Sequence, residues 1–143
     1  MFAVVAMAPS PALAKLYFCT VSATSEAFGS YNVFATTALT TTATVTIAGC
    51  FGTGIGTIAM NQGLHSSTFN PRDMEKSGGT DLLNYNLYTS AAHTTIWGDG
   101  TGGTATVTFT GDGTFTAYGQ VPAGQNVSAG TSYTDSVTIT ISF

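Results

Sequence analysis

Strict alternation of apolar and hydroxyl side chains is the feature that most restricts how this chain can fold. The clearest example is the final segment, in which the apolar positions are Val137, Ile139, Ile141 and Phe143 and the hydroxyl positions are Ser136, Thr138, Thr140 and Ser142. A period of two places the apolar side chains on one face of a β-strand. The same pattern recurs at 19–24 and 42–47. Because no segment has convincing helical periodicity, the sequence predicts an all-β protein.

Composition excludes several classes of function. Thr, Ser and Gly make up 56 of the 143 residues, charged residues are 7%, and the net charge is -4. With only three basic residues there is no surface that neutralises phosphates, so nucleic-acid binding is excluded. No apolar run approaches the roughly 20 residues that a spanning helix needs, and 43% hydrophobic residues argue against disorder. One folded domain with a single core is expected.

Further strands are expected at 57–61, 82–88, 104–110, 114–118 and 133–143, separated by glycine-rich turns. The sum is an antiparallel β-sandwich of six or seven strands. Cys50 falls on the parity opposite to Ile47, which predicts a one-residue bulge near Gly49 if Cys50 is to face the core. The chain also stops on its best strand, without a returning one, so the sandwich is expected to lack its closing strand.

Residues 1–14 resemble a secretion signal, since an apolar stretch from Phe2 to Ala8 is followed by the small-x-small sequence that ends at Ala14. We predict cleavage after Ala14 and a mature domain over 15–143. The alternative is an ordered N-terminal β-strand. Secretion implies an oxidising compartment, and two cysteines permit one bridge, so we predict a disulfide between Cys19 and Cys50.

The sequence offers no constellation for catalysis or for a metal. His65 and His93 lie 28 residues apart without a third ligand at metal-binding spacing, and no Gly-x-Ser-x-Gly elbow is present. We therefore expect no enzyme, no cofactor and no metal. Tyr88 and Trp97 are candidates for a sugar-stacking platform, and the alternative is that a single Trp in a sandwich belongs to the core.

Eight short motifs resemble, in order, those of the spore coat protein U domain, which the subunits of archaic chaperone–usher pili share. They are Cys19-Thr-Val-Ser, Phe28-Gly-x-Tyr31, Cys50, Arg72-x-Met74, Leu83-Asn-Tyr-Asn-Leu-Tyr88, Trp97-Gly-Asp-Gly100, Tyr118-Gly-x-x-Pro-x-Gly-Gln125, and Tyr133-x-Asp135 before the alternating tail. Each motif alone is weak, but the ordered set covers residues 19 to 143. The resemblance departs at Ala92-His93 and in the segment from Gly130 to Tyr133, so the loop surfaces differ.

The resemblance implies an incomplete immunoglobulin-like sandwich that is secreted to the periplasm, held by a chaperone, and passed through an outer-membrane usher into a surface fibre or coat. A neighbouring subunit then supplies the missing strand, and the mature chain has no membrane span. We expect an acceptor groove, partly open in the monomer, lined by Val21, Ala23, Val137, Ile139, Ile141 and Phe143.

Two alternatives stay open at this point. The segment 15–18 is too short to cross a groove, at about 3.3 Å per residue. The subunit therefore either accepts a strand without donating one, as a fibre tip does, or retains residues 2 to 18 as the donor. The second alternative concerns function: a carbohydrate- or surface-binding adhesin on the same scaffold, with Tyr88 and Trp97 as contacts. A secreted hydrolase is a third hypothesis without sequence support.

Overall fold

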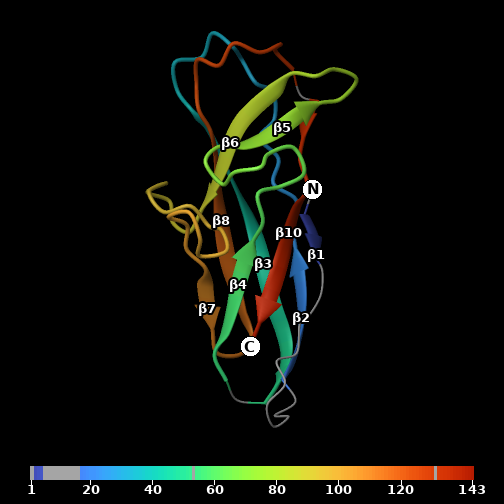
Figure 1. Cartoon of the computed structure of the whole chain (residues 1–143), viewed down its shortest axis with the longest axis vertical. Helices are drawn as coiled ribbons and strands as arrows, with labels where there is room; N and C mark the ends of the chain where they lie inside the picture. The colour runs from blue at the N-terminus through green and yellow to red at the C-terminus, as the bar shows by residue number, and fades with distance from the viewer. Residues whose placement is uncertain (1, 5–16, 53, 131) are drawn as a thin grey trace.

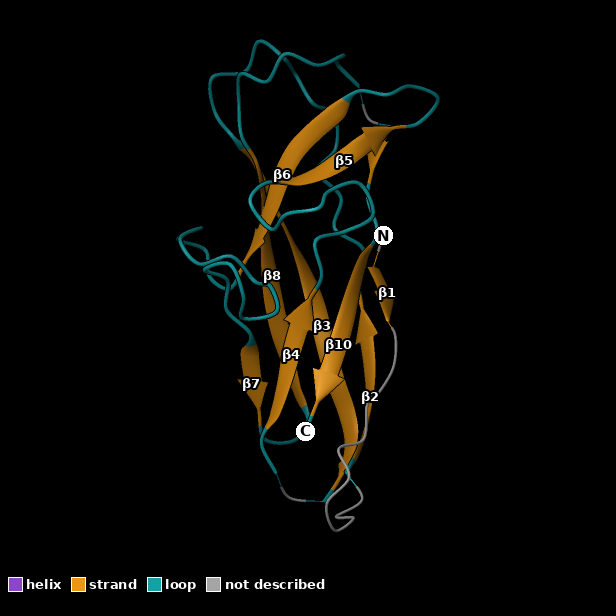
Figure 2. Ribbon diagram, in the orientation of Figure 1, coloured by secondary structure: helices purple, strands orange, loops and turns teal. Residues whose placement is uncertain are grey.

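The computed structural model describes residues 2–4, 17–52, 54–130 and 132–143, and every regular element among them is a strand (Figure 2). The strands are β1 (Phe2–Val4), β2 (Phe18–Ala23), β3 (Leu39–Phe51), β4 (Gly56–Met60), β5 (Arg72–Lys76), β6 (Leu82–Tyr88), β7 (Val107–Phe109), β8 (Gly113–Val121), β9 (Tyr133–Thr134) and β10 (Val137–Ser142). No helix in this part of the chain is long and apolar enough to cross a membrane.

The strands form two sheets, which confirms the predicted β-sandwich. One has the order β1-β10-β4-β7 and the other the order β2-β3-β8-β6-β5-β9 (Figure 1). All described ladders are antiparallel except that between β1 and β10, which is parallel. β1 precedes β2 in the chain but joins the sheet that does not contain β2. It lies between β10 of its own sheet and β2 of the other sheet (Figure 1).

Alternation decides which side chains enter the core. On β3 the positions of Ala43, Val45 and Ile47 are buried and the threonines between them are less buried. On β10 the same alternation buries Val137, Ile139 and Ile141 between the sheets. The predicted segments at 57–61, 82–88 and 114–118 correspond to β4, β6 and β8, whereas the predicted strand at 104–110 contracts to the three residues of β7.

The predicted bulge is present where β2 meets the end of β3. Phe18 pairs with Phe51 but Thr20 pairs with Ala48, so β3 carries one extra residue at this point. Gly49 has φ of +63°, a left-handed conformation that glycine adopts without strain. The extra residue corrects the parity of Cys50, which forms the predicted disulfide with Cys19.

We expect removal of this disulfide to destabilise the fold. The bridge closes a loop of 31 residues, for which chain-entropy arithmetic gives about 3.7 kcal/mol. The double variant Cys19→Ala/Cys50→Ala should lower the free energy of unfolding in urea by about that amount. Two alkylatable thiols in native wild-type protein, detected by intact mass, would contradict the bridge.

Candidate functional site

The unusual part of the sandwich is the side on which β10 and β2 are edge strands. β10 pairs with β4 along Ile139–Ser142, but on its other side the ladder with β1 covers only Val137, Thr138 and Ile139. β2 pairs with β3 alone. Both edges therefore face the same side of the molecule, with the three residues of β1 between them (Figure 1). In the part of the chain that the structure describes, the edge of β10 beyond Ile139 has no strand partner there.

A cavity of about 310 Å³ continues this side of the sandwich past the start of the β1 ladder. Val137, the residue paired with Phe2, lines it, and so does Asp135 two residues earlier. Its remaining walls come from the segment after β2, from β3, β5 and β6, and from β9 with the loop before it. They comprise Glu26, Ala27, Phe28, Gly29, Tyr31, Leu39, Met74, Leu83, Tyr85, Leu87, Gly130, Tyr133 and Thr134. Most of these side chains are apolar or aromatic, so the cavity suits an apolar or amphipathic side chain.

Glu26 is the chemically distinctive group of this cavity. Both carboxyl oxygens are inaccessible to solvent, and neither has a hydrogen-bond partner among the described residues. Burial raises the pKa of Glu26 to about 8, and the backbone of Gly119, which lies close to the carboxylate but outside hydrogen-bonding geometry, opposes the rise only in part. A methyl group at position 119 would collide with the Glu26 carboxylate and the Phe28 ring, so Gly119 provides the space that Glu26 occupies.

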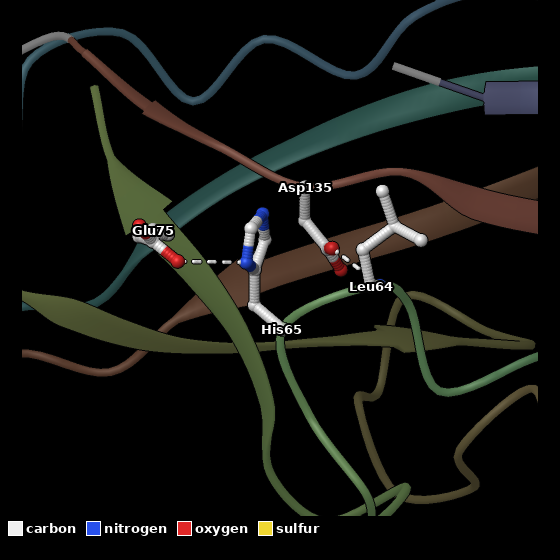
Figure 3. A network of polar contacts seen from close by, with 4 residues as sticks. All are labelled: Leu64, His65, Glu75 and Asp135. Carbon is white, nitrogen blue, oxygen red and sulfur yellow. Dashed lines mark hydrogen bonds and ion pairs between the residues drawn. The ribbon is translucent and has the colours of Figure 1, made fainter. Parts of the chain in front are cut away.

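Asp135, by contrast, is held by hydrogen bonds on both oxygens. The backbone N–H of Leu64 donates to Oδ1 at 2.8 Å (Figure 3). The Tyr85 hydroxyl donates to Oδ2 at 2.6 Å. Burial and the adjacent Asp135 carboxylate raise the pKa of Tyr85, so the hydroxyl keeps the proton that it donates. Beside this network, His65 Nδ1 lies 3.0 Å from Glu75 Oε2. These contacts fix the loop between β4 and β5 against the segment that leads into β10.

Arg72 is fully buried and donates to oxygens that belong to uncharged groups. Its Nε and Nη2 donate to the Asn61 carbonyl at 2.9 and 2.8 Å, and Nη2 also donates to the Trp97 carbonyl at 2.7 Å. Nη1 donates to Asn86 Oδ1 at 2.7 Å. Burial lowers the pKa of Arg72, although nearby acidic groups oppose that shift. The guanidinium is thus committed to joining β4, β5, β6 and the Trp97 loop.

The residues predicted for the acceptor groove lie on the two edges described above, but the expectation of an open apolar face was wrong for β10. Val137, Ile139 and Ile141 are at most 5% exposed, because they point between the sheets and pack into the central core. Phe143 is 40% exposed and stacks on Tyr17. Val21 and Ala23 are half-buried on β2. What β10 leaves incompletely paired is its backbone edge.

Of the two residues predicted as adhesive contacts, Trp97 needs correction and Tyr88 stays a prediction. Trp97 is 1% exposed and its indole N–H donates to the Ile58 carbonyl at 2.9 Å, so it belongs to the core and is closed to a ligand. Tyr88 is half-buried, and its ring meets the edge of His93. Among the described residues, no three His, Cys, Asp or Glu side chains gather at a position that could hold a metal ion.

Sequence reasoning missed Glu26 and the cavity around it. A signal was present, because Glu26 is the one Asp, Glu, Lys or Arg between Lys15 and Arg72. A single charge within 56 residues of otherwise uncharged sequence marks either a solvated turn or a functional group. The position of Glu26 relative to Gly119, Met74 and Tyr85 depends on contacts between remote segments, which local patterns do not reveal.

The described residues thus form an all-β sandwich in which one strand edge is incompletely paired and a cavity lies beside that edge. The chain belongs to the Spore Coat Protein U domain family, whose model matches residues 5–140. This match begins inside the segment 1–14, of which residues 2–4 form β1 and the rest lies outside the described residues. Cleavage after Ala14 and the domain boundary at Lys15 stay predictions.

Two similar proteins give the family match its context. The chain is 38% identical over 94 residues to Protein U of Myxococcus xanthus, an alignment that covers 60% of this chain and 51% of that protein. Its fold is similar to a chain in the CsuC–CsuE chaperone–tip adhesion subunit pre-assembly complex from archaic chaperone–usher Csu pili of Acinetobacter baumannii. The TM-score is 0.58 at 17% identity, covering 90% of this chain and 40% of that one. The chain thus spans about half the length of these proteins or less.

We predict that Glu26 makes the stability of the protein fall with rising pH. The folded state holds the Glu26 proton up to a pKa of about 8, whereas the ordinary value is 4.5. The contribution is complete below pH 4.5 and is lost as the pH rises to about 8. Over most of this window Glu26→Gln should gain on the wild type by about 1.4 kcal/mol per pH unit.

Urea unfolding at pH 5, 6, 7 and 8 measures this difference. Asp81→Asn is the control, because hydrogen bonds from Ser128 lower the pKa of Asp81 and leave it ionised throughout the window. Parallel stability curves for the wild type and Glu26→Gln would contradict the assignment.

Proposed function

We propose that this chain is a structural subunit of a secreted surface fibre or coat, assembled through the chaperone–usher pathway by donor-strand complementation. The observation that carries the proposal is the edge of β10, which is paired over only three residues, by a segment from the opposite end of the sequence. A second strand edge, that of β2, lies across from it. An extended segment of another chain that is seated here would complete both the ladder and the apolar contacts.

Energetics support exchange of the strand beside β10. A ladder of three residues contributes few hydrogen bonds, each with a net value of about 1 kcal/mol. A longer donor that continues along Thr140–Ser142 adds bonds on the same edge and buries alternate apolar side chains at about 1.5–3 kcal/mol each. A longer strand should therefore displace β1, and an exposed edge explains why a subunit in transit would need a chaperone.

The proposed partners follow from this mode of assembly. They are a periplasmic chaperone, an outer-membrane usher and neighbouring subunits, with passage through the periplasm to the cell surface. The similar fold in a chaperone–subunit complex supports the first of these partners. The pairing of residues 2–4 with β10 favours the alternative in which the N-terminal segment is retained as a strand, whereas cleavage after Ala14 would favour an accepting tip. The proposal includes no catalytic step.

We expect a synthetic peptide of alternating valine and threonine to stabilise the protein. At a hundredfold excess over its dissociation constant the gain is about 2.7 kcal/mol, which corresponds to a rise in melting temperature of about 5–10 °C for a domain of this size. A peptide of the same composition with the valines in one block is the control. A melting temperature that no alternating peptide changes would contradict donor-strand assembly for this chain.

A matched pair of variants on β2 locates the effect. Val21→Asp places a carboxylate on the half-buried face of the β2 edge, whereas Ser22→Asp places it on the exposed face of the same strand. The peptide-induced shift should be lost in the first variant and kept in the second. Circular dichroism of both variants checks that they remain folded.

A second candidate function, adhesion to apolar surfaces, is favoured by one specific observation. One end of the sandwich exposes the side chains of Phe18, Phe51, Ile55 and Phe143, here called the end patch. Phe18 and Phe51 are direct cross-strand partners, and Phe143 packs on Phe109 beside the start of β4. Contiguous exposed apolar groups of this kind mark interaction surfaces.

Adsorption to polystyrene beads tests this candidate. We expect Phe51→Ser/Ile55→Ser to reduce adsorption by about tenfold, since these two side chains are the most exposed of the end patch. Phe34→Ser is the matched control, because Phe34 is 89% exposed in the loop before the opposite end of β3. Equal losses in both variants would contradict a specific role for the end patch.

A further inference from the structure

We propose that the cavity beside β10 receives a basic side chain, lysine or arginine, of the strand that occupies this edge, with the Glu26 carboxylate as its counter-ion. The proposal rests on the donor-strand function argued above and names the chemistry that the accepted strand must carry. The cavity would then bind one positively charged side chain of the accepted strand, whereas the other side chains of that strand would make apolar contacts.

The first step of the argument is the position of the cavity along the ladder. β1 runs parallel to β10 with Phe2 opposite Val137, and the cavity begins at Val137 and continues to Asp135. A strand that extends the ladder in this direction therefore passes the cavity opening. Because side chains alternate between faces, one residue of such a strand points inward there. The volume of about 310 Å³ is several times the roughly 30 Å³ occupied by a water molecule, so it has room for a long side chain.

The second step is the charge that the cavity leaves uncompensated. Among the basic side chains, Arg72 is the one whose charge acts on Glu26, and its guanidinium is already bonded to the Asn61 and Trp97 carbonyls and to Asn86. Asp135 has donors on both oxygens from Leu64 and Tyr85. Glu26 is different, because both of its oxygens are buried without a hydrogen-bond partner among the described residues.

The third step is the cost of that arrangement. A buried carboxyl group without a partner is unfavourable in either protonation state, and the charged state is the more costly of the two. A cation delivered by the incoming strand reverses the order, because a carboxylate paired with an ammonium or guanidinium gains charge-assisted hydrogen bonds. Glu26 would then give up its proton when the strand binds. An apolar donor side chain offers no such compensation and leaves the carboxyl group unpaired.

Calorimetry with synthetic peptides on the full chain tests the proposal. The probes are acetylated alternating valine–threonine peptides in which each inward valine in turn is replaced by lysine or by norleucine, which has a similar length and no charge. At one position the lysine peptide should bind at least about tenfold more tightly than the norleucine peptide at pH 7. Titrations in buffers of different ionisation enthalpy should show release of about 0.9 proton, since a group with a pKa of about 8 is mostly protonated at pH 7.

Two variants separate the role of Glu26 from a general effect of charge. In Glu26→Gln the lysine preference and the proton release should disappear while the norleucine peptide still binds, which also shows that the variant is folded. In Glu75→Gln, where the carboxylate pairs with His65 and does not line the cavity, both should be retained.

The outcomes distinguish this proposal from the one on which it rests. If norleucine and lysine peptides bind equally at every inward position, the cavity accepts apolar side chains and the cation site is overturned, while donor-strand acceptance stands. A lysine preference that persists in Glu26→Gln also overturns it, because another group then supplies the charge. If no peptide binds, both proposals fail.

Discussion

The backbone edge of β10 is the constraint on which the rest of the structure depends. The side chains of β10 are fully used, because Val137, Ile139 and Ile141 close the core between the sheets. Its backbone is satisfied by β4 on one side and on the other by only three residues of β1. A strand cannot leave such an edge open without inviting another chain to pair with it. The fold thus combines a complete apolar core with an incomplete hydrogen-bond ladder.

Buried hydrogen-bond networks beside this edge hold the strands of the sandwich together although the ladder along β10 is incomplete. Arg72 ties β4, β5, β6 and the Trp97 loop together through carbonyl and amide oxygens, and Asp135 fixes the segment that enters β10. Both networks satisfy their buried groups, which is the condition under which buried polar residues stabilise a unique packing. Glu26 differs from both networks, because neither of its buried oxygens has a hydrogen-bond partner among the described residues.

The sequence predicted those parts of the fold that depend on local alternation, and it failed where remote contacts decide. The alternation at 136–143 predicts β10, the parity of Cys50 predicts the bulge, and the presence of two cysteines in a secreted chain predicts the disulfide. β5 was not predicted, because Arg72-Asp-Met-Glu-Lys76 has the charges of a surface loop. Arg72 is buried because the carbonyls of Asn61 and Trp97 and the side chain of Asn86 accept its hydrogen bonds, and these groups come from other segments. The burial of Trp97 agrees with the alternative that a single Trp in a sandwich belongs to the core, whereas the cavity around Glu26 became apparent only in three dimensions.

The disulfide has a mechanical consequence for any fibre built from such subunits. Cys19 is the second residue of β2, so tension that enters the sandwich through the chain before Phe18 meets the covalent link to Cys50 almost at once. Beyond this point the load is carried by β3, which has the longest ladder of the molecule with β8 at its centre. β2 therefore cannot be peeled away from its Phe18 end one hydrogen bond at a time. Under load, the Phe18 end of β2 keeps its place beside β3.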